Sequence, residues 1–348
     1  MRPAHPTRRD PAVKEAREVV GLYGDPDTSW GIAIDLGVSR LEPGPVAERL
    51  AVLCAAHSHL GAAPEVELVG EGAWPARRAA LAAAGYGTAS LLRVAVRDDG
   101  RRLAVGAHHG AIDGLGLVAV AAAALGEPLR TRAQGIGDRP ARSGFVRSSI
   151  SRLGEALVDP PPRFAGLGED SPLEDLSELT RPLLGRGTAH LAAAAAGVFG
   201  SRGHEGLPLL VIGASRRVGT LPEPDRQTAY LRLRVRADAE PDHVRRALAT
   251  VDPEPDFPAT SARGIGPRIT HLMRHRLGAT ALLSNLGLFD GPVDSIAMFP
   301  ACSGPRAVAV GLSSTTAATT LALRTRRSDF TADEHASLLS DLGERFFA

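Results

Sequence analysis

Residues 104–114 read AVGAHHGAIDG, and the prediction of fold and function begins from this stretch. An apolar run precedes its two histidines, and an alanine- and leucine-rich run over 114–125 follows them. The spacing predicts a strand that ends near the histidines and a helix that begins near Gly114. His108, His109 and Asp113 then lie at a strand-to-helix turn, where a rigid scaffold commonly presents functional side chains.

The residue types in this turn suit proton transfer. An imidazole titrates near neutrality, so His109 can take a proton from an attacking amine or hydroxyl and return one to a leaving thiolate. Asp113, four residues further on, can curl back beside His109 or pair with an arginine. Gly110 and Gly114 permit tight turns, and N–H groups at the start of the helix could face a developing oxyanion. Because no side-chain nucleophile is adjacent, the pattern favours acyl transfer over hydrolysis.

A plainer interpretation of the same turn stays open. His108 and His109 can be hydrogen-bonded histidines at the end of a strand, and Asp113 can be a helix cap. The turn would then carry structure and no reaction.

The chain before this turn alternates strands with helices. Residues 30–36 alternate apolar with small or polar residues, which predicts a half-buried strand, and Pro45 opens a helix with one apolar face. Residues 90–97 and 101–107 predict two strands joined by an Asp-Asp-Gly turn. Residues 1–28 are polar and interrupted by prolines, so we expect a loosely attached N-terminal arm.

A second patterned block follows residues 126–187, which are rich in proline and glycine and predict a crossover linker between two lobes. Its expected elements are a helix at 190–199, strands at 207–214 and 227–236, helices from Pro241 and over 267–276, a hairpin of 306–314 with 319–326, and a last helix opened by a capping box at 331–334. Both halves mix strands and helices, which indicates an α/β or α+β body with lobes over 29–125 and 188–348.

The overall composition narrows the class of protein. The chain has 348 residues, of which 44% are hydrophobic and 23% charged, as is typical of a globular protein of about two domains. Forty basic and 39 acidic residues give a net charge of +1, so no nucleic-acid or membrane partner is expected. The two cysteines lie far apart and the start of the chain has no apolar h-region, so we expect a cytoplasmic protein.

Lysine is almost absent from the sequence, because Lys14 is the only one. A Walker A loop, a pyridoxal-phosphate site and a protein kinase each need a lysine in a defined context, and the polar stretch around Lys14 supplies none of these. The GxSxG motif of α/β hydrolases is also missing from the sequence. These four enzyme classes are therefore excluded.

Other patterns fit a function less well. The histidine pairs within 57–59 and 271–275 have spacings that suit a metal, but neither has a carboxylate at ligand spacing, so no metal site is expected. Residues 114–116 read GLG, an incomplete form of the nucleotide-binding GxGxxG. Cys54 lies on an apolar helix, which favours a buried side chain over a nucleophile, and Asn285 can simply end a strand.

The HHxxxDG pattern at 108–114 resembles the signature of the condensation-domain superfamily. That superfamily includes the condensation domains of nonribosomal peptide synthetases, polyketide-associated acyltransferases, chloramphenicol acetyltransferase and wax-ester synthases. Residues 281–287 read ALLSNLG and are similar to the SNLG segment that some of these families carry in the second lobe. The final hairpin and capped helix also resemble theirs, so the similarity runs from about Ser29 to the C-terminus.

The resemblance implies two chloramphenicol-acetyltransferase-like lobes in a V, with the active site between them. A phosphopantetheine thioester, on coenzyme A or an acyl carrier protein, would be the co-substrate, and no permanently bound cofactor is implied. A small-molecule amine or alcohol would be the acceptor.

The resemblance also assigns roles to residues of the motif. The second histidine, His109, would be catalytic with His108 beside it, and Asp113 would be salt-bridged to an arginine. The stretch 230–235, YLRLRV, is similar to the family's strand that ends in this arginine, so Arg234 is the first choice and the alternatives are Arg232 and Arg217. Substrate contacts would come from Gly114, Ser284, Asn285 and Gly287.

The sequence departs from the family pattern in several places. It is shorter than typical condensation domains and lacks the DFGWG, SxAQxRLW and RDxSRNPL motifs. We therefore expect a stand-alone acyltransferase of natural-product biosynthesis. Two alternatives are a non-catalytic condensation-like protein that binds a carrier protein or pathway partner, and a cyclisation or elimination enzyme that uses the same histidine.

Overall fold

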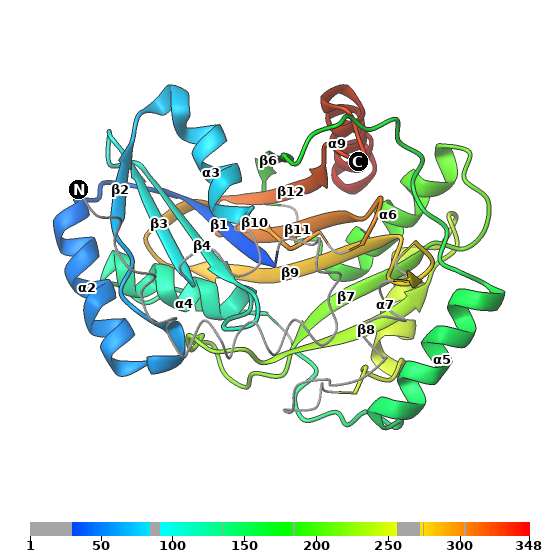
Figure 1. Ribbon diagram of the computed structural model, residues 1–348. Coiled ribbons are helices and arrows are strands. Elements are labelled where there is room, and N and C mark those ends of the chain that lie inside the picture. Colours follow the sequence, from blue (N-terminus) through cyan, green and yellow to red (C-terminus); the bar gives the residue numbers. More distant parts are fainter. Residues whose placement is uncertain are drawn as a thin grey trace, which may run out of the picture.

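The computed structural model describes residues 30–83, 91–133, 135–183, 185–255, 272–273, 275–302 and 304–348. Two β-sheets form the centres of two lobes, and helices cover their faces (Figure 1). This arrangement confirms the expected α/β class. The expected arm at 1–28 lies outside the described residues, as does most of the helix expected at 267–276.

The first sheet has five strands in the order β10-β1-β4-β3-β2. Its strands are β1 (Gly31–Val38), β2 (Val66–Val69), β3 (Leu92–Arg97), β4 (Arg102–His108) and β10 (Val293–Phe299). One face packs against helices α2 (Pro43–Ala56) and α4 (Gly114–Leu125), and α3 (Trp74–Ala82) covers the other. The short 3₁₀ helices η1 (Ser58–Leu60) and η2 (Glu71–Ala73) connect these elements. Both faces are covered, and all of β1 is accordingly buried.

The second sheet has seven strands, six of them in the order β6-β12-β11-β9-β7-β8, with β5 paired to β9. Its strands are β5 (Arg130–Thr131), β6 (Glu174–Pro182), β7 (Leu209–Ser215), β8 (Thr228–Arg234), β9 (Ala281–Asp290), β11 (Val308–Thr315) and β12 (Ala318–Arg326). Helices α6 (Thr188–Ser201), α7 (Pro241–Thr250) and α9 (Ala332–Phe347) pack on one face through a common apolar core. Helix α5 (Phe145–Val158) lies beside β8, at the lower right of Figure 1.

The strand pairing departs from the expected lobe boundaries in two places. Residues 293–299 fell within the expected second lobe and were not predicted as a strand, but they form β10, which pairs antiparallel with β1 of the first sheet. The linker expected at 126–187 contains β5, α5 and β6, and β6 pairs along its whole length with β12. Alternation within a strand predicts which face is buried, but it carries no information on which sheet the strand joins. The sequence pattern therefore could not show that β10 pairs with β1 or that β6 pairs with β12.

Several local expectations are confirmed. Helix α4 spans 114–125 as its pattern predicts, and the hairpin forms as β11 and β12. The capping box of α9 is complete, since the Thr331 side chain accepts from the N–H of Glu334 and the Glu334 side chain accepts from the N–H of Thr331. Asn285 was expected at a strand end but lies within β9, beside a register shift against β11. No described helix has the length and apolar character that crossing a bilayer requires.

A buried arginine ties the two sheets together. Arg324 of β12 is fully buried, and its Nε lies 2.9 Å from a carboxylate oxygen of Glu174 on β6. The same guanidinium donates to the carbonyls of Gly31 at 2.7 Å and Ala82 at 3.0 Å, both in the first lobe, and to that of Pro300 at 3.1 Å. One planar side chain therefore satisfies acceptors from both lobes.

Arg324→Met should destabilise the whole protein, because it leaves the Glu174 carboxylate and three carbonyls buried without their donor. Removing one partner of a buried ion pair costs about 3–5 kcal/mol in the free energy of unfolding. Denaturant unfolding measures this loss. Arg236→Met is the matched control, since Arg236 makes a two-point pair with Asp238 on the surface and should leave stability unchanged. Equal stability of the Arg324 variant and wild type would contradict the role of Arg324 as a tie.

Candidate functional site

The HHxxxDG turn is anchored where β4 ends and α4 begins. The backbone N–H of His109 donates to the carbonyl of Trp30 at 2.7 Å, and that of His108 donates to Leu91 at 2.8 Å. The carbonyl of His108 in turn accepts from the N–H of Ala111 at 3.0 Å. These backbone bonds hold both histidines at the end of β4, the central strand of the first sheet.

The two histidines have different surroundings. His108 is buried, and its Nδ1 accepts the backbone N–H of Gly110 at 3.1 Å, which shapes the turn. His109 is partly exposed; its Nδ1 lies 3.0 Å from the carbonyl of Ile112 and its Nε2 lies 3.0 Å from the hydroxyl of Tyr230. The second histidine of the pair is therefore the one available to a reactant.

The partners of His109 fix its tautomer. A carbonyl oxygen can only accept, so Nδ1 carries the proton and donates it to Ile112. Nε2 then holds a lone pair, and the Tyr230 hydroxyl donates to it. An imidazole in this state is ready to accept a proton at Nε2.

Burial sets the protonation of this pair. The surrounding protein removes solvent from the ring and lowers the pKa of His109, and the charge of Arg226 lowers it further, against the opposing effects of the Ile112 carbonyl and Asp113. Burial also raises the pKa of Tyr230 to about 12. Near neutral pH both side chains are therefore uncharged, with one lone pair and one hydroxyl proton between them.

Asp113 is a structural lock between the lobes. It is 1% exposed, and its Oδ1 accepts the N–H of Gly116 at 2.8 Å as the N-cap of α4. Its Oδ2 accepts from three groups of the second lobe: Nη1 of Arg217 at 2.7 Å, the N–H of Gln227 at 2.7 Å and the hydroxyl of Thr228 at 2.9 Å. Both oxygens are engaged in these bonds, and Nδ1 of His109 has a different hydrogen-bond partner.

The expected partner of Asp113 was wrong. Arg217, one of the two alternatives, forms the ion pair, whereas Arg234 pairs with Glu155 and Asp159 of the α5 region. The reason is geometrical: residues 228, 230, 232 and 234 share one face of β8, and only the first of them lies against Asp113. Each further pair of residues moves about 7 Å along the strand, beyond the reach of an ion pair to that carboxylate.

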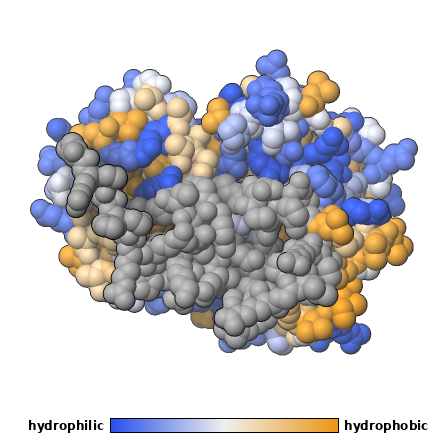
Figure 2. All heavy atoms as spheres, in the orientation of Figure 1, coloured by the Kyte–Doolittle hydropathy of each residue, from blue (hydrophilic) through white to orange (hydrophobic). Residues whose placement is uncertain are grey.

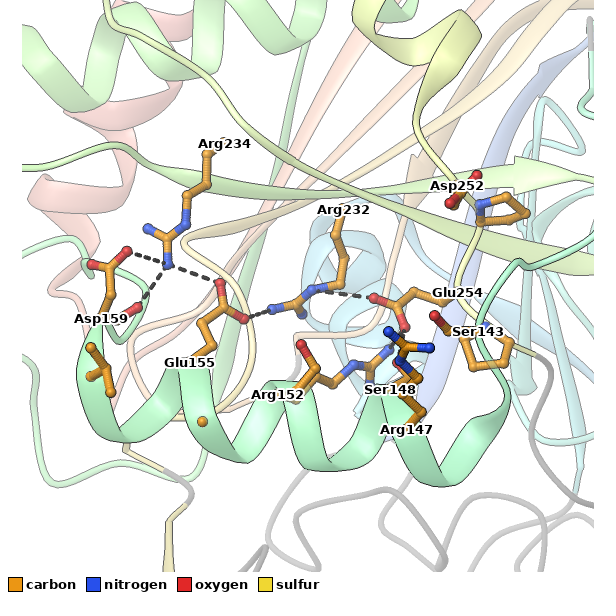
Figure 3. Close-up of a pocket in the computed structure, with 15 residues that line it drawn as sticks. Ser143, Arg147, Ser148, Arg152, Glu155, Asp159, Arg232, Arg234, Asp252 and Glu254 are labelled. Carbon is orange, nitrogen blue, oxygen red and sulfur yellow. Dashed lines mark hydrogen bonds and ion pairs between the residues drawn. The ribbon is translucent and has the colours of Figure 1, made fainter.

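The arginines of β8 instead bind helix α5. Arg232 pairs with Glu155 and Glu254, and Arg234 pairs with Glu155 at 2.9 Å (Figure 3). They line a polar cavity of about 760 Å³ between α5 and β8. Figure 3 shows Glu155 of α5 engaged with both Arg232 and Arg234 of β8, and these ion pairs attach the polar face of the helix to the sheet.

The SNLG segment forms a bulge in β9. The Asn285 side chain accepts the N–H of Gly287 at 2.9 Å and donates to the Thr188 hydroxyl at 3.0 Å, where α6 begins. Gly287 has a φ of +86°, and a Cβ there would lie 2.7 Å from the backbone nitrogen of Ala133. Ser284 lies just before the bulge and pairs with Gly213 and Gly311 in the sheet. Asn285 and Gly287 thus shape the strand.

At the start of α4, one of the N–H groups that were expected to face an oxyanion is already bound, and the helix is closely packed. The N–H of Gly116 is bound by Asp113, and a Cβ on Gly114 would lie 2.9 Å from Leu286 and 3.2 Å from Met298. Gly114 therefore allows the helix to approach the SNLG segment closely. This close approach brings the HHxxxDG motif into contact with the SNLG segment through Leu286.

Two residues at the site were missed or ranked too low. Tyr230 belongs to the predicted strand at 227–236, but nothing in that pattern shows which residue of the other lobe it faces. Arg217 follows β7 in a loop, where no periodicity constrains its direction. Only the pairing of the two lobes reveals either contact.

Comparison with solved structures identifies the fold. No family model and no curated protein matches the sequence. Among solved structures, a mutant starter condensation domain of rhizomide synthetase RzmA in complex with C8-CoA matches with a TM-score of 0.56 and 13% identity, covering 97% of this chain and 93% of that one. The chain has the condensation-domain fold.

Two further structures with this fold are similar over most of their length. The EpoB cyclization-docking bidomain from Sorangium cellulosum has a TM-score of 0.55 and 12% identity, covering 94% of this chain and 82% of that chain. The first condensation domain of the calcium-dependent antibiotic synthetase, in complex with a substrate analogue, has a TM-score of 0.54 and 14% identity, with 92% of each chain covered. In the condensation-domain fold of the present chain, His109 comes from one lobe and Tyr230 from the other.

Asp113→Asn should act first on folding. The substitution removes the negative charge opposite Arg217, and the new amide NH₂ group would face groups that themselves donate hydrogen bonds. Loss of one side of this buried pair should cost about 3–5 kcal/mol and lower the melting temperature, the soluble yield and activity together. Arg234→Met is the comparison, since Arg234 faces partly exposed carboxylates and its loss should cost much less. An unchanged melting temperature in Asp113→Asn with activity lost would place Asp113 in the chemistry instead.

Proposed function

We propose that this protein transfers an acyl or aminoacyl group from a pantetheine thioester to an amine or hydroxyl acceptor, with His109 as the general base. One observation carries the proposal: a neutral His109 with an Nε2 lone pair stands where the two lobes of a condensation-domain fold meet. The thioester would be carried by coenzyme A or an acyl carrier protein, and the reaction would belong to natural-product biosynthesis in the cytoplasm.

The geometry of His109 supports both halves of the transfer. Nε2 takes the proton of the acceptor as the acceptor attacks the thioester carbonyl. The Nδ1–H bond to Ile112 keeps the ring oriented and stabilises the imidazolium that forms. The same Nε2–H then protonates the departing thiolate, and the histidine returns to its starting tautomer.

Direct transfer fits this chain better than an acyl-enzyme. A thiolate would be the strongest available nucleophile, but Cys54 and Cys302 are both buried. Burial raises the pKa of each thiol, that of Cys302 to about 12. Neither is poised for nucleophilic attack.

Part of the expected substrate contact remains a prediction. Ser284 lies on β9 just before the bulge, where its side chain would meet a substrate that reaches His109 along the second sheet. Gly114, Asn285 and Gly287 would act on substrate through the shape they give the two motifs.

His109→Ala should lower kcat by about 100-fold or more, because general-base contributions commonly reach 10² to 10⁴. Thiol release from acetyl-CoA and octanoyl-CoA with a panel of amines and alcohols measures it. The melting temperature should stay near that of wild type, and His108→Ala should lose less activity. Full activity in a folded His109→Ala protein would remove the base role. A wild type that binds the carrier thioester without turnover would favour the non-catalytic alternative.

The pH dependence of kcat should reflect a base with a depressed pKa. His109 must be neutral to accept a proton, and burial lowers its pKa. An ordinary histidine is half protonated at about pH 6.5. Activity should therefore persist below that pH and fall only under more acidic conditions. An alcohol acceptor is used because an amine would itself titrate. An acid limb centred at pH 7 or above would contradict the assignment.

A further inference from the structure

The Tyr230 hydroxyl occupies the place that a reacting acceptor must take. It lies 3.0 Å from Nε2 of His109 and donates its proton to the lone pair. An acceptor that gives its proton to Nε2 must come equally close, so it displaces this hydrogen bond. The hydroxyl is then free to turn toward another oxygen beside the base.

Several backbone N–H groups of the HHxxxDG turn are already engaged in hydrogen bonds. Asp113 engages the N–H of Gly116, and Nδ1 of His108 engages that of Gly110. Gly114 is covered by Leu286 and Met298. The backbone N–H of His109 donates to Trp30. These three N–H groups are not available to a tetrahedral intermediate at His109, so a donor from the second lobe would add to those that remain.

We propose that Tyr230 is a second catalytic residue, whose hydroxyl donates a hydrogen bond to the oxyanion formed when the acceptor attacks an acyl thioester. This inference rests on the proposed function and adds an oxyanion donor from the second lobe to the base from the first. The substrate class it implies is one with an attacked carbonyl, since that oxygen gains negative charge in the transition state.

Distances around Nε2 allow this arrangement. The nucleophile sits about 3 Å from Nε2, and the attacked carbon about 3 Å from the nucleophile. The carbonyl oxygen is one bond further. A rotation of the Tyr230 side chain that clears the place of the acceptor must then bring the hydroxyl within about 3 Å of this oxygen.

The strand holds the phenol in place. Thr228, two residues before Tyr230 on β8, donates to Asp113, and Tyr230 itself pairs with Gly213 of β7. Because side chains two apart share a face, the bond at Thr228 directs Tyr230 toward the motif. Burial raises the pKa of Tyr230 to about 12, so the phenol keeps its proton and remains a donor.

Two proton transfers through Nε2 of His109 connect the two halves of the reaction. The acceptor N or O forms a bond to the carbonyl carbon, its proton passes to Nε2 of His109, and the carbonyl π electrons move onto oxygen, which accepts the Tyr230 hydrogen bond. The oxyanion then re-forms the carbonyl, the C–S bond breaks, and the thiolate takes the proton from Nε2. The products are an amide or ester and a free thiol, and both side chains are restored.

Tyr230→Phe tests the proposal, because it keeps the ring and removes only the hydroxyl. The first measurement is the pKa of His109 by NMR in the free protein, with the signal assigned through His109→Ala. The charged groups that face the ring are Asp113 on its own turn and Arg226 before β8, and the variant changes neither. A donor to Nε2 favours the neutral ring, so its removal should raise the pKa of His109.

The second measurement is turnover of octanoyl-CoA and acetyl-CoA with the same acceptors, at a pH where His109 is neutral in both proteins. We expect kcat to fall about 100-fold in Tyr230→Phe with KM changed only a few-fold, as for the loss of one oxyanion donor. Thr180→Val, which removes a hydroxyl bound to Thr320 in the second sheet, is the control. It should leave the pKa of His109 and kcat unchanged, because Thr180 lies on β6, at the edge of that sheet opposite β8.

Each outcome decides a different point. An unchanged kcat in Tyr230→Phe, with an active wild type, would overturn the oxyanion role and leave the proposed function intact. An unchanged pKa of His109 would remove the hydrogen bond on which the argument rests. A wild type that turns over neither thioester would overturn the proposed function and the role of Tyr230 with it, even if the pKa shift were observed.

Discussion

The carboxylate of Asp113 is the constraint on which the site depends. One oxygen caps α4 in the first lobe, and the other accepts three donors from the second lobe. Two of those donors, Gln227 and Thr228, stand at the start of β8, so the carboxylate fixes where that strand begins. Tyr230 follows on the same face and meets His109. The distance between the base and the phenol is thus set by a residue that touches neither.

Arginine supplies most of the long-range ties, which suits a chain with a single lysine. Arg324 reaches one carboxylate and three carbonyls, and Arg217 binds Asp113 and Asp225 together. A planar guanidinium with five N–H groups can satisfy several acceptors at once, whereas an ammonium acts as a point charge. The buried acceptors at the lobe junction, where the two lobes share Asp113 and Arg324, therefore need arginine for geometric reasons.

The sequence predicted local structure well and partners across the lobes poorly. Helix α4, the capping box of α9 and the position of His109 follow from short-range patterns, and each is present. The pairing of Asp113 with Arg217 joins residues 104 positions apart in the sequence. Arg234, the expected partner, lies on β8 six residues beyond Thr228, and it pairs with Glu155 instead. Strand β10 likewise carries no signal for its crossing to the first sheet. Periodicity fixes a face, whereas a partner depends on how two separately patterned halves dock.

This distinction explains why a histidine motif alone gives an incomplete account of the site. The HHxxxDG turn supplies His109 and the lock at Asp113, and its amides at Gly110 and Gly116 are used for turn formation and capping. The proton donor beside His109 comes from the other lobe, which Asp113 places in register. The geometry of the candidate site therefore depends on the docking of the lobes. Residues two apart on a strand share a face and lie about 7 Å from each other. A change that shifts β8 along the neighbouring strand would therefore separate Tyr230 from His109, even though every residue of the HHxxxDG motif stayed in place.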